Sequence, residues 1–216
     1  MDTITLRKEE PADWREVENL VREAFWNQFA PGCVEHYLAH TLRNCEDFVT
    51  ELDFIALSGG KIIGNIMYTK ARIVLDAGGE LPVLSFGPLA VLPTSQKQGI
   101  GGRLVMHTAA LAREAGHSAI LIYGDPGYYS HLGFVSAEHF GIGTADNLYR
   151  ASLQAMELQP GALSDASGLF HESAAFDIDP VASVAFDSTF PPKPHEEGNP
   201  AQRKFHEILA LVKPRH

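Results

Sequence analysis

A glycine-rich turn between a predicted strand and a predicted helix constrains the fold of this chain more than any other feature. Residues 96–102 read Gln-Lys-Gln-Gly-Ile-Gly-Gly, and they separate an apolar strand over 82–91 from a helical pattern over 100–115. Small residues let the backbone turn sharply, and the first N–H groups of a helix lack intrahelical partners. Because those groups and the helix dipole favour anions, the junction predicts a pyrophosphate site.

Two common phosphate-binding loops do not fit this turn. A Walker loop requires Gly-Lys-Ser/Thr after a glycine and four residues, and the sequence has no such run. A Rossmann fingerprint requires a third glycine where this chain has Leu104, and a meander of strands precedes the turn. The remaining alternative to an anion site is a glycine-rich turn that serves tight packing alone.

Composition and charge narrow the class of protein and its partners. The chain has 216 residues, 45% of them hydrophobic and 20% charged, which is typical of one compact globular domain. Its formal net charge of −10 repels phosphate backbones, so nucleic acid is not an expected partner, whereas a cationic amine is attracted. No apolar run reaches the ~18 residues of a membrane span, and the first ten residues lack a signal peptide's apolar stretch. Cys33 and Cys45 form no disulfide framework, so we expect a cytoplasmic protein.

Hydrophobic periodicity predicts the element order βα(α)βββαβ, followed by a short helix and further strands. The predicted strands cover residues 3–6, 54–57, 62–74, 82–91 and 118–123; the predicted helices cover 10–30, 34–42 and 100–115. This order favours an α/β fold, a three-layer arrangement in which a mixed central sheet carries helices on both faces. Gly87-Pro88 lies inside a predicted strand and therefore indicates a bulge or an irregular edge.

The sequence pattern is less regular in the C-terminal part, from residue 153 onward. Residues 153–158 resemble a strand, and residues 160–179 are expected to be irregular. Four residues, Pro191-Pro192-Lys193-Pro194, predict a stiff linker to a helix over 200–212. The apolar face of that helix would comprise Phe205, Ile208, Leu209 and Val212. The expected organisation is a catalytic domain over 1–190 and a linker with a helical tail over 191–216.

Several motifs together resemble the GNAT superfamily of acyl-CoA-dependent N-acetyltransferases. Gln96-x-x-Gly99-x-Gly101 resembles its Gln/Arg-x-x-Gly-x-Gly/Ala signature, and residues 87–93 resemble the strand and bend that precede it. Downstream, the run from Tyr129 to Phe134 is similar to the superfamily's Tyr-x-x-x-Gly-Phe ending. The agreement in order and spacing covers about residues 54–140. More narrowly, residues 124–129 resemble a bacterial branch of predicted acetyltransferases.

The resemblance implies a site for acetyl-CoA as co-substrate. In this superfamily two strands splay apart, and the cofactor's pantetheine arm lies between them like an added strand. The residues expected to bind the arm through their backbone are Leu89, Ala90 and Val91. Those expected to hold the pyrophosphate are Gln96, Lys97, Gln98, Gly99, Ile100, Gly101, Gly102 and Arg103. Tyr129 occupies the position of the general acid, since a phenol with a pKa near ~10 is protonated at neutral pH.

The other candidates near that tyrosine have structural alternatives. Tyr128 is expected to pack at the core or the rim. Asp125 and His131 are candidate general bases, but Asp125 is placed to cap a one-turn helix with Pro126 at its first position, and His131 is placed to face solvent. Deprotonation of the amine by water therefore stays the leading alternative.

A second group of candidates lies in the predicted N-terminal helices. Cys33, His36 and His40 could meet on one helical face, where imidazole and thiolate would suit zinc. The run from His36 to His40 lacks the glutamate of a metalloprotease motif, so ordinary packing is expected and no metal is predicted. By analogy with the superfamily's variable helices, Glu35, His36 and Tyr37 would shape the acceptor pocket.

These observations predict an enzyme that transfers an acetyl group from acetyl-CoA to a primary amine of a small molecule, by direct attack in a ternary complex. Two alternatives stay open: a non-catalytic module that binds or senses acyl-CoA, and an acetyltransferase acting on a protein N-terminus or lysine. We expect no metal and no membrane partner, from the residue spacing and the apolar runs described above. Because dimers are common in the superfamily, a homodimer is among the expectations.

Overall fold

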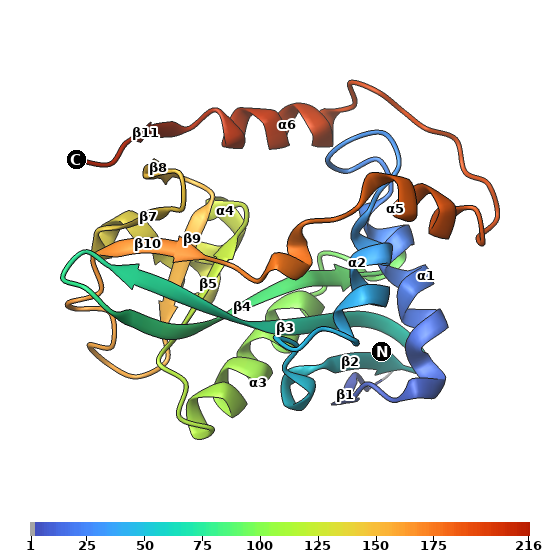
Figure 1. Ribbon diagram of the computed structural model, residues 1–216. Coiled ribbons are helices and arrows are strands. Elements are labelled where there is room, and N and C mark those ends of the chain that lie inside the picture. Colours follow the sequence, from blue (N-terminus) through green and yellow to red (C-terminus); the bar gives the residue numbers. More distant parts are fainter. Residues whose placement is uncertain (1–2) are drawn as a thin grey trace. The chain divides into compact units, whose positions relative to one another are not determined.

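The computed structural model describes residues 3–216, whose internal contacts define two compact units (Figure 1). Among these residues, the first unit comprises 3–67, Pro88–Val105 and Ala174–Phe205, and the second comprises Tyr68–Gly87, Met106–Ser173 and His206–His216. Among residues 3–216, no helix combines the length and the apolar character that a membrane span needs.

Three antiparallel strands form the sheet of the first unit. β1 (Thr5–Lys8) pairs with β2 (Phe54–Ser58), and β2 pairs with the first half of β3 (Lys61–Leu75). Gly59 and Gly60 join β2 to β3 with backbone φ angles of 56° and 79°. Consecutive positive φ values belong to the tight hairpin turn that the sequence predicts, because their twist matches that of the flanking strands.

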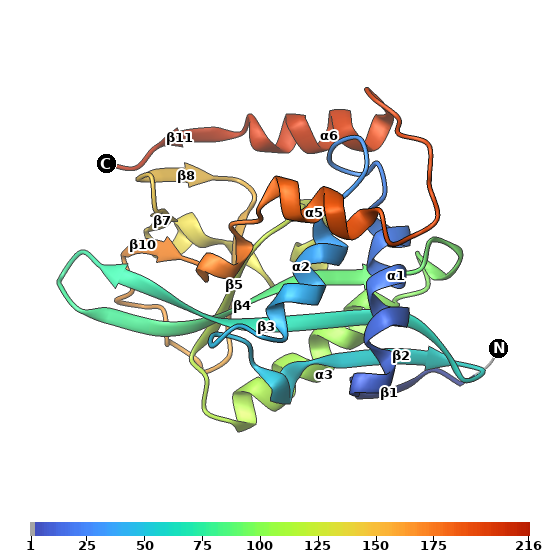
Figure 2. The same cartoon turned by 45° about the vertical axis from the view of Figure 1, so that its right-hand side comes forward.

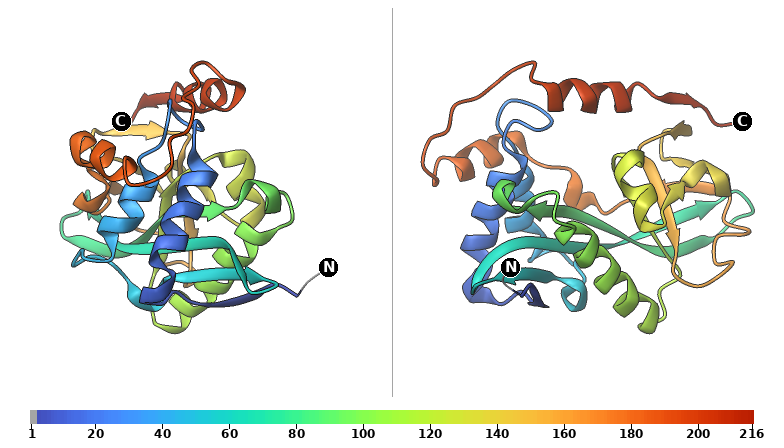
Figure 3. Two further views of the ribbon diagram at one scale, coloured as in Figure 1. Left: turned by 90° about the vertical axis from the view of Figure 1, so that its right-hand side faces the viewer. Right: turned by 180° about the vertical axis from the view of Figure 1, so that it is seen from behind.

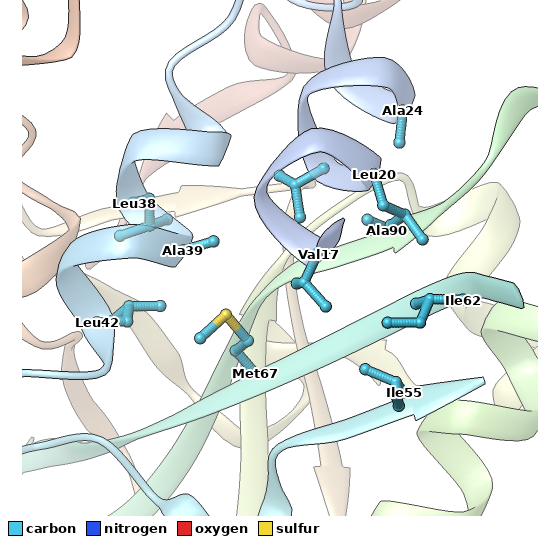
Figure 4. Packing of buried hydrophobic residues seen from close by; sticks show 11 residues of the cluster. Val17, Leu20, Ala24, Leu38, Ala39, Leu42, Ile55, Ile62, Met67 and Ala90 are labelled. Carbon is cyan, nitrogen blue, oxygen red and sulfur yellow. The ribbon is translucent and has the colours of Figure 1, made fainter. Parts of the chain in front are cut away.

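Two helices cover this sheet and close its core. α1 (Trp14–Phe25) and α2 (Glu35–Leu42) lie side by side over the strands (Figure 2). Their apolar faces pack on Met67 of β3 and on Ala90, near the end of β4 (Glu80–Val91) (Figure 4). The buried residues of this core include Val17, Leu20, Leu38, Ala39, Leu42, Ile55 and Ile62. The backbone of Ala90 is thereby held against a rigid apolar layer.

α1 ends earlier than the sequence pattern predicts. The helix was expected to continue to Pro31-Gly32, but it stops at Phe25 because Asn27 takes a left-handed backbone conformation with φ 60°. The Asn27 side chain then closes the loop, accepting the Gly32 N–H at 2.8 Å. Asparagine tolerates this conformation better than most residues, so it ends the helix without a glycine.

The second unit contains a mixed sheet. β4 pairs in parallel with β5 (Ala119–Tyr123), and β5 pairs in antiparallel fashion with β9 (Leu153–Glu157). β9 also pairs with β6 (Val135–Ser136). The strand β10 (Gly168–His171) runs antiparallel to the second half of β3 and parallel to β7 (Ile142–Thr144). The expected mixed sheet with flanking helices is confirmed.

The expectation of an irregular segment over residues 160–179 is wrong at β10. Its four residues, Gly-Leu-Phe-His, carry no strand-length alternation, so tertiary pairing decides their conformation. Gly168 is required there because an added Cβ would lie 2.2 Å from the Val74 carbonyl oxygen. Phe170 is buried in the core of this unit together with Ile73, Leu121 and Ala155.

The remaining elements are the long helix α3 and several segments that are short or lie near the C-terminus. The helices are α3 (Ile100–Glu114), α4 (Pro126–Tyr129), α5 (Pro180–Asp187) and α6 (Pro200–Leu209), and the last strands are β8 (Leu148–Arg150) and β11 (Val212–Pro214). Short 3-10 turns cover Pro11–Asp13, Thr50–Leu52, Pro93–Ser95, Ser130–Leu132, Ala137–Phe140 and Ala174–Phe176.

The C-terminal helix is shorter than predicted. α6 ends at Leu209, so Val212 does not share a helical face with Phe205; instead it lies in β11, which pairs with β8. The backbone pairing of β11 continues at Leu211, whose carbonyl accepts the Ala151 N–H. Phe205 packs on Phe29 in the first unit, with ring centroids 4.5 Å apart.

Candidate active site

The glycine-rich turn leads directly into the N-terminus of α3 (Figure 3). Lys97 and Gly99 both have positive φ angles, 61° and 77°, on either side of Gln98. A left-handed conformation costs a lysine roughly 1–2 kcal/mol, so it persists only where the surrounding bonds enforce it. Here the Gln96 side chain donates to the Val91 carbonyl at 3.1 Å.

The first turn of α3 leaves backbone donors without partners inside the helix. The N–H of Arg103 bonds the Gly99 carbonyl at 3.0 Å, which begins the helical ladder. By helix geometry the N–H groups of Ile100, Gly101 and Gly102 have no carbonyl four residues earlier within the helix. Residues 96–99 are exposed, so an anion can approach these donors and the positive end of the helix dipole. The chemistry of this turn fits a pyrophosphate.

The backbone at the end of β4, in the same unit, packs closely against β3. Ala90 is 1% exposed, and Leu89 and Val91 are partly exposed. Gly64 of β3 is required here because an added Cβ would approach the Ala90 carbonyl oxygen to 3.2 Å and the Leu104 side chain to 3.1 Å. In the second unit, the register recorded between β4 and β5 is a single pair, Leu84 with Ile120.

Tyr129 lies at the end of α4, in the second unit. The Asp125 carboxylate accepts the Gly127 N–H at 2.9 Å and Pro126 follows it, which confirms the predicted cap and first helical position. The Tyr129 ring contacts Phe134 and Phe86, with centroids 5.4 and 5.9 Å away. Burial raises the pKa of Tyr129 above its ordinary value, so the phenol is protonated at neutral pH.

The spacing of the Tyr-x-x-x-Gly-Phe run has a local cause. Gly133 takes φ 90° at the end of the turn after α4, a conformation that favours glycine. The chain therefore reverses, and the Phe134 N–H donates to the Tyr129 carbonyl at 3.2 Å. This reversal places the Phe134 ring against the Tyr129 ring. The motif thus encodes a buried aromatic contact around the hydroxyl-bearing residue.

The backbone of Gly124 lies against the ring of Tyr129. A Cβ at this position would lie 2.1 Å from Cε2 and 2.6 Å from Cδ2 of the tyrosine ring. The ring therefore lies directly on the backbone where β5 ends. Gly124 belongs to the motif over residues 124–129, but the motif does not predict this contact, which only the fold of α4 over β5 creates.

The neighbours of Tyr129 have the surface positions that the sequence indicates. Tyr128 is 42% exposed and makes an edge contact with Tyr129, with centroids 5.0 Å apart, so it belongs to the rim. His131 is exposed. The Asp125 carboxylate is engaged as the helix cap, and its negative charge contributes to the raised pKa of Tyr129.

The cysteine and histidines of the first unit form a packed cluster. Cys33 Sγ lies 3.4 Å from His36 Nδ1, and His36 Nε2 lies 3.1 Å from the Asp187 carboxylate, which also binds Arg22. Burial raises the pKa of Cys33 to about 12 and lowers the pKa of His36 to about 4, so both groups are neutral at pH 7. His40 instead contacts Glu18 at 2.8 Å. Within residues 3–216, no group of three or more metal-ligating side chains comes together.

Glu35 begins α2 beside this cluster. Its carboxylate accepts the Val34 N–H at 3.0 Å, and burial raises its pKa. Tyr37 packs on Phe186 of α5, with centroids 5.5 Å apart. The contribution of α5 and Asp187 to this surface was missed, because they are distant in sequence and carry no motif.

A cavity of about 750 Å³ lies in the second unit. Its walls come from α4, β6, β9 and tail residues 210–213, and include Phe134, which also contacts Tyr129. No motif indicates this cavity, because its walls come from segments far apart in the chain.

Comparison with known proteins yields consistent likenesses. A family model described as an acetyltransferase (GNAT) domain matches residues 5–137. YhbS of Escherichia coli, named as an uncharacterized N-acetyltransferase, is 29% identical over 172 residues, which cover 78% of this chain and 97% of YhbS. A second Escherichia coli protein of similar description, YjhQ, is 32% identical over 83 residues, covering 38% of this chain and 45% of YjhQ.

Two solved structures share the architecture. The crystal structure of YhbS from Escherichia coli in complex with CoA is 26% identical, with a TM-score of 0.73, covering 82% of this chain and 94% of that chain. A GNAT family acetyltransferase from Brucella melitensis in complex with acetyl-CoA is 28% identical, with a TM-score of 0.61, covering 82% of this chain and all of that chain (100%).

Proposed function

Because this chain belongs to the GNAT acetyltransferase family, we propose that it transfers an acetyl group from acetyl-CoA to a primary amine of a small molecule. It is an N-acetyltransferase that acts with acetyl-CoA; the proposal concerns the acceptor, the residues and the mechanism. The observation that carries the proposed use of acetyl-CoA is the exposed turn before α3. There, two left-handed residues present backbone donors beside a helix N-terminus.

We propose that the first unit binds the cofactor through its backbone. Leu89, Ala90 and Val91 would bond the pantetheine arm as an added strand would. The pyrophosphate would be held by the turn and the first residues of α3: Gln96, Lys97, Gln98, Gly99, Ile100, Gly101, Gly102 and Arg103. Main-chain donors suit this task because they are fixed by the fold and cost little ordering on binding.

In the proposed reaction the amine attacks the thioester directly. The ammonium first loses a proton to water, and its lone pair then forms the C–N bond with the acetyl carbonyl carbon. The nitrogen of the tetrahedral intermediate, which carries a positive charge, releases a second proton to water. As the intermediate collapses to the amide, the C–S bond breaks, and the CoA thiolate takes the proton of Tyr129. The tyrosinate regains a proton from water. Since the thioester is already activated, the protein mainly positions the two reactants.

A thiol-release assay with purified protein tests the proposal. Acetyl-CoA alone should release little free thiol, and addition of a primary amine from a small-molecule panel should release it with one acetylated amine per thiol. A CoA-sensing module would bind acetyl-CoA in calorimetry but release no thiol with any amine. A protein acetyltransferase would modify lysine or N-terminal peptides and leave the small amines unchanged.

Gly99→Ala is expected to weaken acetyl-CoA binding about 5- to 30-fold, the equivalent of roughly 1–2 kcal/mol. An alanine lets the free turn relax from φ 77°, so binding must restore the strained conformation. Isothermal titration calorimetry measures the affinity. Gly116→Ala is the matched control, because Gly116 has φ 87° at the other end of α3. Equal affinity of Gly99→Ala and the unaltered protein would argue against a role of the turn.

We also propose that residues 1–190 form the catalytic domain and that residues 191–216 stabilise it as a tail. In the first unit the Trp26 indole donates to the Pro194 carbonyl at 2.8 Å, and in the second the Arg215 side chain donates to the Gly141 carbonyl at 2.9 Å. Deleting 191–216 should lower the free energy of unfolding by at least about 2 kcal/mol, because each net hydrogen bond contributes about 1 kcal/mol. Urea unfolding measures the free energy of unfolding, and calorimetry measures the acetyl-CoA affinity of the truncated protein. Loss of acetyl-CoA affinity in the folded truncated protein would place the tail in the site instead.

A further inference from the structure

The cavity of the second unit has one wall that the C-terminal tail supplies. β11 pairs with β8, and the Ala151 N–H donates to the Leu211 carbonyl at 3.0 Å. These backbone bonds fix tail residues 210–213 as part of the cavity wall. The volume of about 750 Å³ is typical of sites that enclose a small molecule, and such sites are usually formed before the ligand arrives.

Much of the cavity wall is apolar. Phe134 and Tyr149 supply two aromatic rings, and Leu211 and Val212 supply aliphatic side chains that are 58% and 44% exposed. A molecule with an apolar body that fills the cavity would remove part of this aliphatic surface from water, which favours binding. The rings add the large contact area that aromatic ligands use.

A buried amide in the wall has an acceptor to offer. Gln154 of β9 is 2% exposed, and its Nε2 donates to the Ala151 carbonyl at 2.8 Å and to the Leu153 carbonyl at 3.4 Å. Because both neighbours are acceptors, they fix which end of the amide is the nitrogen. Within residues 3–216, Gln154 Oε1 has no hydrogen-bond partner, yet it keeps accessible surface. Since Gln154 lines the cavity, this oxygen can accept a hydrogen bond from a ligand there.

The two charged side chains of the cavity wall neutralise each other. Lys213 Nζ lies 2.6 Å from the Glu138 carboxylate. A charged ligand would have to compete with this ion pair for its counter-charge, whereas an uncharged ligand leaves the pair intact. Tyr129 is not one of the residues that line the cavity, so a molecule held there does not contact the proposed general acid.

We propose that this cavity is a second ligand site, which binds an uncharged molecule with an aromatic body and one hydrogen-bond donor. The body packs against Phe134, Tyr149 and Leu211, and the donor bonds Gln154 Oε1. The ligand does not take part in acetyl transfer. The turn proposed to hold the pyrophosphate of acetyl-CoA belongs to the first unit, so the two molecules contact different residues.

Three aromatic probes of one shape test the chemistry of the ligand. N-Phenyl-1-naphthylamine is uncharged, has one N–H donor and fluoresces in apolar surroundings, so a fluorescence titration should show one molecule bound per chain. 8-Anilinonaphthalene-1-sulfonate adds a negative charge to the same skeleton and should bind at least ~10-fold more weakly, in about 0.5 M NaCl to screen the net charge of the chain. 1-Phenoxynaphthalene replaces the N–H with an ether oxygen and should compete at least ~3-fold more weakly, because Gln154 Oε1 then lacks a donor.

A pair of tail variants locates the bound probe. Leu211→Glu puts a carboxylate into the apolar wall and should weaken binding of N-phenyl-1-naphthylamine at least ~10-fold. The exposure of Leu211 means that the fold tolerates this change. Leu209→Glu is the matched control, because Leu209 is 39% exposed in the same tail but does not line the cavity, and it should leave the affinity within about twofold.

Acetyl-CoA separates this site from the cofactor site. A saturating concentration of acetyl-CoA should leave the affinity for N-phenyl-1-naphthylamine within about twofold, and displacement of the probe would mean that it occupies the cofactor site instead. No binding of the probe, equal binding in Leu211→Glu and the unaltered protein, or tighter binding of the sulfonate would each overturn the proposal. None of these titrations contains an amine acceptor, so their outcome is independent of whether the protein transfers acetyl groups.

Discussion

Replacing Tyr129 with Phe is expected to lower kcat at least ~10-fold while acetyl-CoA affinity stays nearly unchanged. The phenylalanine ring retains the contacts with Phe86 and Phe134 and loses only the hydroxyl. Without that proton donor, the CoA thiolate must leave unprotonated or take its proton from water. Stopped assays at saturating substrates measure kcat, and calorimetry measures the affinity.

The pH profile gives this test a second readout. Burial raises the pKa of Tyr129, and a raised pKa means that the acid stays protonated to higher pH than a free phenol. The alkaline loss of kcat that belongs to Tyr129 should therefore lie above the ordinary phenol value of ~10 and disappear in Tyr129→Phe. Tyr128→Phe is the matched control at the neighbouring, more exposed ring, and should retain kcat. A Tyr129→Phe protein with unchanged kcat would remove the acid role.

The parts of the fold that the sequence predicts well are those whose cause is local. The strand before the glycine-rich turn and the helix after it follow from periodicity and from the small residues between them. The cap at Asp125 and the hairpin at Gly59-Gly60 follow from residue types that suit one backbone conformation. In each case, neighbouring residues decide the outcome, so a single sequence suffices.

Elements that depend on distant partners were not predictable in this way. β10 becomes a strand because β3 and β7 offer it hydrogen bonds, and Val212 leaves the predicted helix because β8 pairs with it. The same limit applies to the candidate site. Gly124 lies in a local motif, but only the fold of α4 over β5 places its backbone against the Tyr129 ring.

The second large effect is expected from Gly124→Ala, a change that adds one carbon and no new chemistry. The added Cβ would lie 2.1 Å from Cε2 of Tyr129 and 3.0 Å from the Ile122 side chain, well inside van der Waals contact. The ring cannot move aside freely because Phe134 and Phe86 enclose it. The hydroxyl should therefore be displaced, and kcat should fall at least ~10-fold, since small misplacements of a catalytic group are costly. Overpacking should also lower the free energy of unfolding by about 1–3 kcal/mol.

Double variants separate the two consequences of Gly124→Ala. Added to Tyr129→Phe, it should cause little further loss of kcat, because the hydroxyl that it displaces is already gone. Added to Tyr129→Ala, it should cost little stability, because the clashing ring is absent. Gly127→Ala in α4 is the control, since its Cβ would meet only the Asp125 side chain, at 3.2 Å. Fully additive losses of kcat in Gly124→Ala/Tyr129→Phe would mean that Gly124 acts on the reaction by a route other than the position of the Tyr129 hydroxyl.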